Sequence, residues 1–210
     1  MVNMKIWIYI FSLVFLFSCK PPSNIPNGEF SKWKNERKPE KWMLKCGERT
    51  TDAKEGKYAV RLQACEFGGS QEPGVAFSGH INFWSFLASL IKKSNSMLDH
   101  SLEGYPLTFK PKELKGYYKY SAEKSDTAVV FGWIAQKIEG KKVRIATIGG
   151  LISDTTSIYK PFRFKFKYKE EYKNYDVSGG KLWISFSSTQ GYNRDSLNRS
   201  TLYLDDVKIE

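Results

Sequence analysis

Aromatic side chains are the residues of this sequence whose chemistry best suits a binding site. Five of them stand on segments that we expect to come together in space: Trp84, Tyr117, Tyr120, Trp133 and Trp183. Aromatic rings stack on the apolar face of a sugar, while neighbouring polar groups meet its hydroxyls. Alternation along strands buries about half of such rings, and we expect Tyr118 and Phe131 among the buried ones. The cluster therefore predicts a glycan-binding surface, on which Trp84 is the residue most favoured for exposure.

A row of cations is the second candidate surface. Residues 162–169 alternate strictly between two kinds of side chain. The aromatic positions are Phe162, Phe164, Phe166 and Tyr168, and the cationic positions are Arg163, Lys165, Lys167 and Lys169. Because the side chains of a strand alternate between its faces, we expect one strand that buries the rings and exposes all four cations. Such a row protects an edge strand or is simply solvated, or it docks on an anionic surface, which the net charge of +11 also favours.

Catalytic motifs are missing from the sequence. The two histidines, His80 and His100, stand in no H-E-x-x-H pattern, no pair of C-x-x-C motifs supplies zinc ligands, and no G-x-S-x-G nucleophile elbow is present. Glycoside hydrolysis needs two carboxyl groups flanking the bond, and Glu103, Asp126 and Asp154 are not set apart by their context. We therefore predict no catalytic residue, and a polysaccharide-degrading glycosidase or lyase is an alternative.

The first 18 residues predict a signal peptide. Lys5 is followed by an apolar run from Ile6 to Phe17, which is too short to span a membrane comfortably but suits a signal-peptide core. The run ends at Ser18-Cys19, which resembles the lipobox of bacterial lipoproteins, although Phe17 is bulkier than the residue usual there. The resemblance implies cleavage before Cys19 and its acylation, for example with palmitate, and hence a membrane anchor. An ordinary secretory signal with a chance cysteine is the alternative.

Residues 19–28 predict a lipidated cysteine and a linker, and residues 29–210 predict one folded domain. The linker is rich in Pro, Asn and Ser and has no hydrophobic periodicity. Within the domain, Cys46 and Cys65 either form a disulfide, as an exported protein permits, or remain two buried thiols. The sequence gives no geometry that decides between them.

Segments rich in β-branched and aromatic residues predict strands throughout the domain. The segments 114–121 and 127–134 stand around a polar turn and are expected to lie side by side as a hairpin. The second is apolar on both faces, which predicts a central strand of a layered structure. Further strands are expected at 42–44, 58–62, 143–148, 162–169, 182–186 and 200–209.

Three further segments have other signals. The last strand changes phase across Asp205 and Asp206, which predicts a bulge. Residues 66–80 contain several glycines and Pro73 and predict a loop. Residues 81–93 predict a short amphipathic helix or an apolar flap. Many short strands with so little helix predict an all-β protein with a jelly-roll β-sandwich.

Landmarks along the chain resemble a family of bacterial envelope lipoproteins. In order they are N-G-E-F-x-x-W at 27–33, P-x-x-W at 39–42, G-K-Y-A-V-R-L at 56–62, L-K-G-Y-Y-K-Y-S at 114–121, D-T-A-V-V at 126–130 and S-T-L-Y-L-D-D-V-K-I at 200–209. Their order and spacing, over nearly all of the mature chain, resemble the "putative carbohydrate metabolism domain" family of Bacteroidetes lipoproteins, which is similar to jelly-roll carbohydrate-binding modules. The resemblance implies one jelly roll, an outer-membrane anchor and a role with glycans.

The same resemblance implies that a structural calcium ion could be bound. Many carbohydrate-binding jelly rolls hold one, and the matching positions here are Glu29, backbone groups near Gly56 and Lys57, and Asp205. Such oxygen ligands suit calcium. This sequence has Ser31 where those modules often carry a glutamate, which removes one carboxylate. A bulge cap is therefore the favoured role of Asp205 and calcium the alternative, and no other cofactor is expected.

Together these features predict a cell-envelope lipoprotein, anchored in the outer membrane and facing the periplasm or the exterior, whose non-catalytic jelly roll binds glycan. A structural or adhesion subunit is the main alternative, docking through the row 163–169 on another envelope protein or an anionic polymer. We expect no nucleic-acid partner, because the protein is predicted to be exported and its cations follow one strand face.

Overall fold

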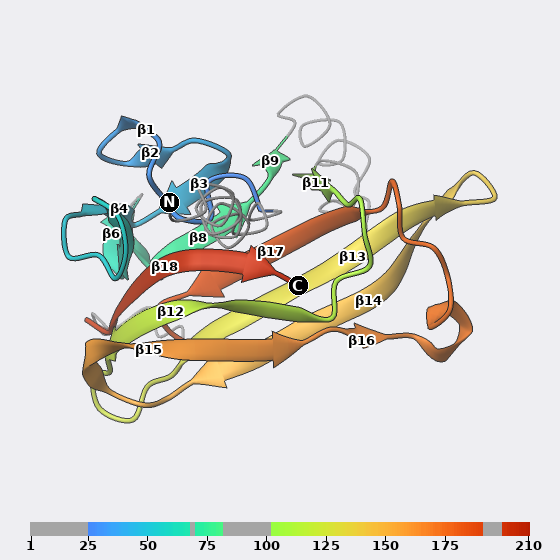
Figure 1. Ribbon diagram of the computed structural model, residues 1–210. Helices are drawn as coiled ribbons and strands as arrows, with labels where there is room; N and C mark the ends of the chain where they lie inside the picture. The colour runs from blue at the N-terminus through green and yellow to red at the C-terminus, as the bar shows by residue number, and fades with distance from the viewer. Residues whose placement is uncertain (1–24, 68–69, 82–101, 191–198) are drawn as a thin grey trace, which may run out of the picture.

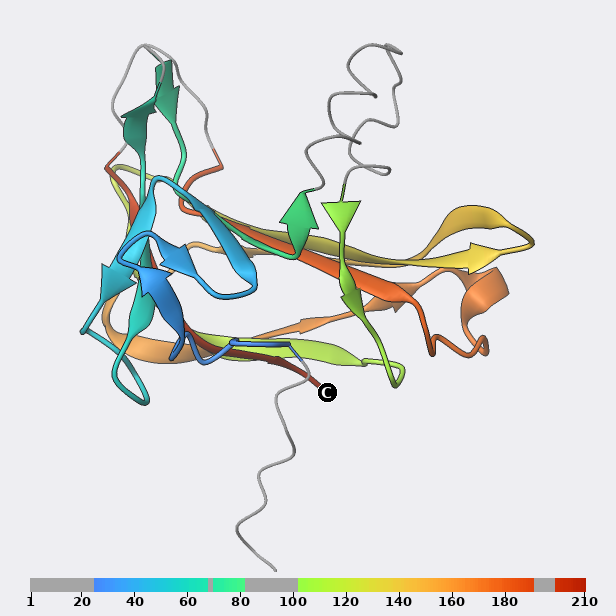
Figure 2. The ribbon, with the colours of Figure 1, turned by 90° about the horizontal axis from the view of Figure 1, so that it is seen from above.

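Two antiparallel β-sheets pack face to face. The computed structural model describes residues 25–67, 70–81, 102–190 and 199–210. The five-stranded sheet contains, in spatial order, β15 (Thr156–Lys165), β12 (Glu113–Ser121), β18 (Thr201–Ile209), β5 (Ala59–Gln63) and β4 (Gly47–Thr50). The seven-stranded sheet contains β16 (Lys167–Tyr168), β14 (Lys141–Ile152), β13 (Ala128–Ile138), β17 (Lys181–Ser187), β8 (Val75–Ser78) and β3 (Trp42–Lys45), and β11 (Tyr105–Pro106) also pairs with β17. Figure 2 shows the two layers edge-on.

Short strand pairs extend the sandwich. They are β1 (Trp33–Asn35) with β2 (Lys38–Pro39), β6 (Cys65–Phe67) with β7 (Ser70–Glu72), and β9 (His80–Ile81) with β10 (Leu102–Glu103). A 3-10 helix, η2, covers Glu170–Tyr172. Figure 2 shows β6–β7 and β9–β10 projecting from the side of the seven-stranded sheet. Across the described ranges, no helix has the length and hydrophobicity that crossing a membrane requires.

The core lies between the sheets and follows from strand alternation. On β12, Tyr118 and Tyr120 point inward and are buried, which confirms the prediction for Tyr118. The Tyr120 hydroxyl donates to the Ser188 carbonyl oxygen (3.2 Å), which joins the two layers. From the opposite sheet, the buried ring of Phe186 meets Phe162 edge to face at 5.7 Å. Large rings fitted in this way account for much of the packing energy.

The strands β12 and β13 do not form the predicted hairpin. β12 lies in the five-stranded sheet and β13 in the seven-stranded sheet (Figure 1), so the polar turn between them crosses the sandwich. Both segments have one apolar face. This pattern is compatible with two neighbouring strands of one sheet and equally with two strands that pack against each other from opposite sheets. The prediction that β13 is a central strand is confirmed, because β14 and β17 flank it.

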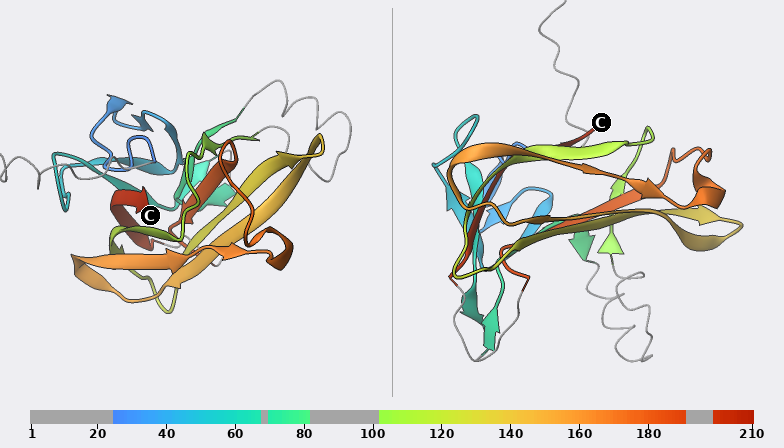
Figure 3. Two further views of the ribbon diagram at one scale, coloured as in Figure 1. Left: turned by 45° about the vertical axis from the view of Figure 1, so that its right-hand side comes forward. Right: turned by 90° about the horizontal axis from the view of Figure 1, so that it is seen from below.

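At two points the chain passes from a strand of one sheet directly into a strand of the other. β3 and β4 are separated only by Cys46, and β15 and β16 only by Phe166. The Phe166 N–H donates to the Lys112 carbonyl (2.9 Å), and the Cys46 carbonyl accepts from the Gln63 N–H (3.1 Å). At these two places a strand of one sheet continues into a strand of the other after a single residue, as the paths of β15 and β16 show in Figure 3.

The second of these crossings corrects the prediction of one cationic row. Arg163 and Lys165 point outward from the five-stranded sheet, where Arg163 pairs with Glu113 (Nε–Oε2 3.4 Å). Lys167 lies on the seven-stranded sheet beside Thr147, and Lys169 follows beyond β16. The alternation itself was predicted correctly, since Phe162 and Phe166 are buried. The cations nevertheless face opposite sides, because the strand changes sheet while keeping its rings inside.

The folded part begins earlier than predicted. Ile25 is fully buried, although residues 19–28 were expected to be linker. The Asn27 side chain donates to the carbonyls of Lys32 (2.8 Å) and Glu40 (2.9 Å), and the Gly28 carbonyl accepts from Val207 of β18 (2.8 Å). These bonds fix residues 25–28 to the five-stranded sheet. Residues 1–24, with the predicted signal and Cys19, lie outside the described residues.

Most other predicted strands are confirmed, with shifted ends. The prediction of a loop at 66–80 is wrong, because glycines and a proline hid the alternation of the inward Ala76 and Ser78 with the outward Val75 and Phe77 in β8. The bulge at the end of the chain is confirmed by the register, in which the two residues between Asp205 and Lys208 oppose one residue of β12. The helix or flap predicted at 81–93 lies, apart from Ile81, outside the described residues.

Candidate functional site

An aromatic cluster lies on the outward face of the seven-stranded sheet. On β13, Val130 and Ile134 point into the core, so Phe131 and Trp133 point outward. Trp133 stands directly opposite Trp183 of β17, and their rings stack with centroids 5.5 Å apart and planes 18° apart. The ring of Phe131 lies 5.6 Å from that of Trp133. Two predicted binding residues are thus brought together.

The exposure of these rings differs from the prediction. Trp133 is 7% and Trp183 0% exposed, whereas Phe131, expected in the core, is 45% exposed. The backbone of Gly104 lies on the indole of Trp183, because a Cβ there would be 2.6 Å from that ring. The sequence did not reveal the phase of a strand that is apolar on both faces. The tryptophans are therefore a packed base, and Phe131 is the ring that solvent reaches.

The indole N–H groups of the two tryptophans are unsatisfied. Both Nε1 atoms are buried, and neither has a hydrogen-bond partner among the described residues. A buried donor without an acceptor costs about 1–3 kcal/mol. The packing of the two indoles therefore outweighs the cost of these two donors.

Cations lie over the faces of the same rings. The Lys142 Nζ is 4.6 Å from the Trp183 ring centroid, and the Arg144 Cζ is 5.2 Å from that of Trp133. These distances are within the range of cation–π contacts. Both cations come from β14, the neighbour of β13, so the sheet itself positions them.

An exposed strip runs across the sheet beside the tryptophan pair. We call this cross-strand row the aromatic strip, and its successive positions are Gly149, Phe131, Ser185, Phe77 and Met43. Phe77 is partly buried and Met43 is 38% exposed, while Ser185 supplies a hydroxyl between two rings. The next row is Leu151, Val129, Ser187, Val75 and Lys45. Neither row contains an aspartate or glutamate, and the single cation, Lys45, pairs with Glu72 (Nζ–Oε2 3.1 Å), so this part of the face offers mainly apolar surface and hydroxyls.

The remaining predicted aromatic residues lie elsewhere. Tyr120 is fully buried in the core and cannot contact a ligand. Tyr117 is on the outward face of the five-stranded sheet, where the Lys54 Nζ lies 5.5 Å from its ring centroid. Trp84 lies outside the described residues. Sequence reasoning missed Phe77 and Met43, and the alternation within 75–78 was the signal for the first.

Both oxygens of the Asp205 carboxylate already accept backbone hydrogen bonds. Its Oδ2 accepts the N–H groups of Lys54 (2.8 Å) and Glu55 (3.0 Å), and its Oδ1 accepts that of Asp206 (2.8 Å). Burial raises the pKa of the Asp205 carboxyl, while these N–H groups act in the opposite direction. N–H donors pointing at the carboxylate exclude a cation from the same side. Glu29 is exposed, and among the described residues it accepts a hydrogen bond only from the Ser31 hydroxyl (3.1 Å).

The residues present therefore do not fit the ion that the family resemblance raised. In the parts of the chain that the structure describes, no group of three or more His, Cys, Asp or Glu side chains is placed to hold a metal. Asp205 instead fastens the loop at 54–55 to the last strand.

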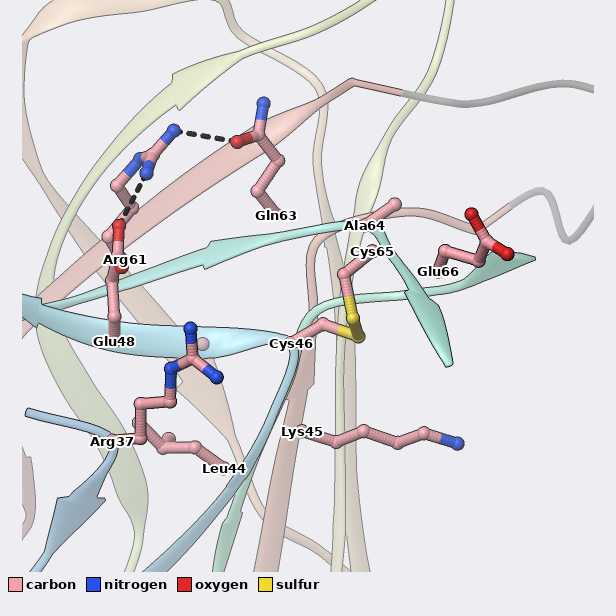
Figure 4. Close-up of a pocket in the computed structure, with 11 residues that line it drawn as sticks. Arg37, Leu44, Lys45, Cys46, Glu48, Arg61, Gln63, Ala64, Cys65 and Glu66 are labelled. Carbon is pink, nitrogen blue, oxygen red and sulfur yellow. Dashed lines mark hydrogen bonds and ion pairs between the residues drawn. A yellow bond between two sulfur atoms is a disulfide. The ribbon is translucent and has the colours of Figure 1, made fainter. Parts of the chain in front are cut away.

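A cavity of about 710 Å³ lies beside the first sheet crossing, as Figure 4 shows. Cys46 and Cys65, joined by a disulfide, form part of its wall. The Arg61 guanidinium bridges Glu48 Oε1 (2.5 Å) and Gln63 Oε1 (2.6 Å). This arginine is engaged by its neighbours, and the lining carries both signs of charge, with Arg37 and Lys45 beside Glu48 and Glu66.

The disulfide itself has a measurable effect on stability. Replacing both Cys46 and Cys65 with alanine is expected to lower the free energy of unfolding by about 3 kcal/mol, because the bond closes a loop whose ends are 19 residues apart. Urea unfolding of the variant and the parent protein measures the difference. A parent protein whose midpoint does not move under reducing conditions would contradict the expectation.

Comparison with known proteins adds evidence on the fold. No protein-family model and no characterised protein sequence matches the chain. A "putative glycoside hydrolase" from Bacteroides vulgatus superimposes with a TM-score of 0.58 at 17% identity, covering 79% of this chain and 78% of that one. The chain has a jelly-roll fold. A second "putative glycoside hydrolase", from Bacteroides thetaiotaomicron, gives a TM-score of 0.57 at 15% identity, and the match covers 90% of this chain but 62% of that one.

A more distant match is a family 11 carbohydrate-binding module from Clostridium thermocellum, solved in complex with a mixed-linked tetrasaccharide. Its TM-score is 0.42 at 11% identity, over 85% of this chain and 94% of that one. At these identities the likeness concerns the fold alone.

Proposed function

We propose that the aromatic strip is a non-catalytic binding surface for glycan. The observation that carries the proposal is the exposed Phe131 ring on a packed tryptophan base, with the Ser185 hydroxyl and the Phe77 ring next to it. Sugars need this combination, since rings stack on their apolar faces while hydroxyls exchange hydrogen bonds with polar side chains.

The strip has the rigidity and length for an oligosaccharide. Its positions belong to five adjacent strands, and four steps of about 4.8 Å give a length of about 19 Å. Because Phe131 and Phe77 are held in a paired sheet, they lose little conformational freedom on binding.

The composition of the strip favours binding over hydrolysis. Cleavage of a glycosidic bond requires two carboxyl groups on either side of it. Neither the strip nor the row beside it presents an aspartate or glutamate. We therefore assign no catalytic residue to this surface.

The proposal includes attachment to the cell envelope. The predicted lipid on Cys19 would be only six residues from the buried Ile25. Six extended residues reach about 20 Å, so the domain would lie close to the membrane. Mass spectrometry of the protein from its native envelope tests the acyl group on Cys19.

Phe131→Ala tests the binding surface. We expect about a tenfold loss of affinity for a glycan that the parent protein binds, because one stacking ring is worth about 1.4 kcal/mol. Affinity electrophoresis against a panel of polysaccharides, followed by calorimetry on those that bind, measures the loss.

Tyr175→Ala is the matched control, since Tyr175 is 41% exposed but lies in the segment after η2. Equal losses in both variants would remove the strip as the binding site. A parent protein that neither binds nor shortens any polysaccharide would refute the proposed function.

A further inference from the structure

A second cavity lies at a fork in the seven-stranded sheet. One edge of β17 pairs with β8 through Ser185–Ser187 and with β11 through Lys181 and Leu182. The two partner strands diverge between these contacts, and the Ser78 hydroxyl accepts the Ile184 N–H (2.8 Å) at the point of divergence. A cavity of about 520 Å³ lies there, lined by residues of β1, β2, β3, β11 and β17.

The charge of this cavity is strongly positive. Four lysines line it, namely Lys34, Lys38, Lys41 and Lys181, against the single carboxylate of Glu40. Among the described residues, none of these four lysines forms an ion pair, and all four are exposed. Four cations around one cavity with a single counter-charge repel each other, and an anion between them relieves the repulsion. We call these residues the lysine cluster.

The cavity wall is fixed by hydrogen bonds to one residue. Lys41 has a left-handed backbone, with φ at +66°. Its carbonyl accepts both the Tyr105 hydroxyl (2.9 Å) and the Gly79 N–H (3.4 Å). Tyr105 is buried, so the bond ties the turn between β2 and β3 to β11. The lysines thus project from a defined frame rather than from a loose loop.

The cavity is continuous with the aromatic strip. Met43 is the last position of the strip and also lines the cavity, and Gly104, which covers Trp183, lines it as well. A chain of sugars that lay along the strip and extended past Met43 would meet the lysine cluster.

We propose that the lysine cluster binds an anionic substituent of the glycan, so that the ligand is an acidic polysaccharide. This inference rests on the proposed function of the strip. The shared chemistry is a carboxylate or sulfate group on a sugar ring, which lysine ammonium groups bind as point charges. A neutral glycan would use the strip alone.

The experiment compares polysaccharides that differ only in charge. Polygalacturonate and its methyl ester form one pair, and dextran sulfate and dextran form the other. Each is titrated into the full-length protein by calorimetry at low and at high salt. We expect an acidic member to bind at least about tenfold more tightly than its neutral partner at low salt, and the advantage to shrink as salt screens the lysines. The pair that shows the advantage identifies the substituent as carboxylate or sulfate.

Two double variants identify which lysines attract the acidic polysaccharide. Lys41→Gln with Lys181→Gln removes two cations of the cluster, and Lys112→Gln with Lys165→Gln removes two exposed cations on the side of the five-stranded sheet. We expect the first variant to lose about tenfold in affinity for the acidic member and to keep its affinity for the neutral one. The second variant should keep both affinities.

Three results would overturn the inference. Equal losses in the two double variants would show diffuse attraction by net charge. Equal binding of the acidic and neutral members, still weakened by Phe131→Ala, would leave the strip as a glycan site and remove the lysine cluster from it. If neither acidic member binds although another polysaccharide of the panel does, the inference fails and the proposed function stands.

Discussion

Replacing Trp183 with alanine is expected to lower the free energy of unfolding by about 4 kcal/mol, the range seen when a large buried ring is removed. Trp183 is fully buried although it points away from the core between the sheets. It stacks on Trp133 and underlies Gly104, so its loss leaves a void that neighbouring backbone cannot fill. Chemical unfolding followed by circular dichroism measures the change.

The Trp183→Phe variant distinguishes the contribution of ring packing to stability from the cost of the unsatisfied indole N–H group. Phenylalanine keeps a ring in the stack and removes the buried N–H group, so we expect a loss below about 1.5 kcal/mol. A Trp183→Ala variant with the same free energy of unfolding as the parent protein would show that the outward cluster is not packed. In that case Phe131 would lack the rigid base on which the proposed binding depends.

Replacing Asp205 with alanine is the second change with a large expected effect, also about 4 kcal/mol. The carboxylate accepts three backbone N–H groups, and each loses its acceptor at a cost of about 1–3 kcal/mol. Two of these donors, from Lys54 and Glu55, belong to a loop about 150 positions away in the chain. Thermal unfolding shows the loss, and faster amide exchange at 54–55 locates it.

Asp206→Asn is the matched control, because among the described residues the Asp206 carboxylate pairs only with Lys208 (2.9 Å) at a partly exposed site, and asparagine tolerates the left-handed backbone of this position (φ +47°). Pairs of this kind contribute about 0–1 kcal/mol. If a bound calcium ion held Asp205, a chelator would destabilise the parent protein as much as the alanine substitution does. We expect the chelator to leave its melting temperature unchanged.

Alternation predicted the strands well, because one buried face imposes a period of two wherever it occurs. The strict pattern of 162–168 placed the rings of Phe162 and Phe166 in the core, and the phase change at Asp205 located the bulge. The all-β sandwich follows from many such segments and agrees with the structure.

The pairing between strands that are distant in the sequence could not be predicted from the alternation within single strands. Nothing in the turn after β12 indicates that β13 belongs to the opposite sheet, so Tyr117 and Trp133 were expected together and lie on opposite sides of the molecule. The lysine cluster could not be predicted for the same reason, since Lys41 and Lys181 are 140 positions apart in the sequence. Local patterns determine which face is buried, while loop paths determine which outward faces meet.

The two sheet crossings have a mechanical consequence. The N-terminal segment is fastened to the five-stranded sheet through Gly28 and Val207, whereas the aromatic strip lies on the other sheet. In the proposed arrangement, a pull between a lipid anchor and a bound glycan would load both layers, because the chain also runs from Gly28 through β1 and β2 into β3 of the seven-stranded sheet. At Cys46 and Phe166 a strand of one layer continues into a strand of the other after a single residue, so force passes there along a very short stretch of backbone. The layers should resist sliding and peeling apart under such a pull, and they should fail together rather than one after the other.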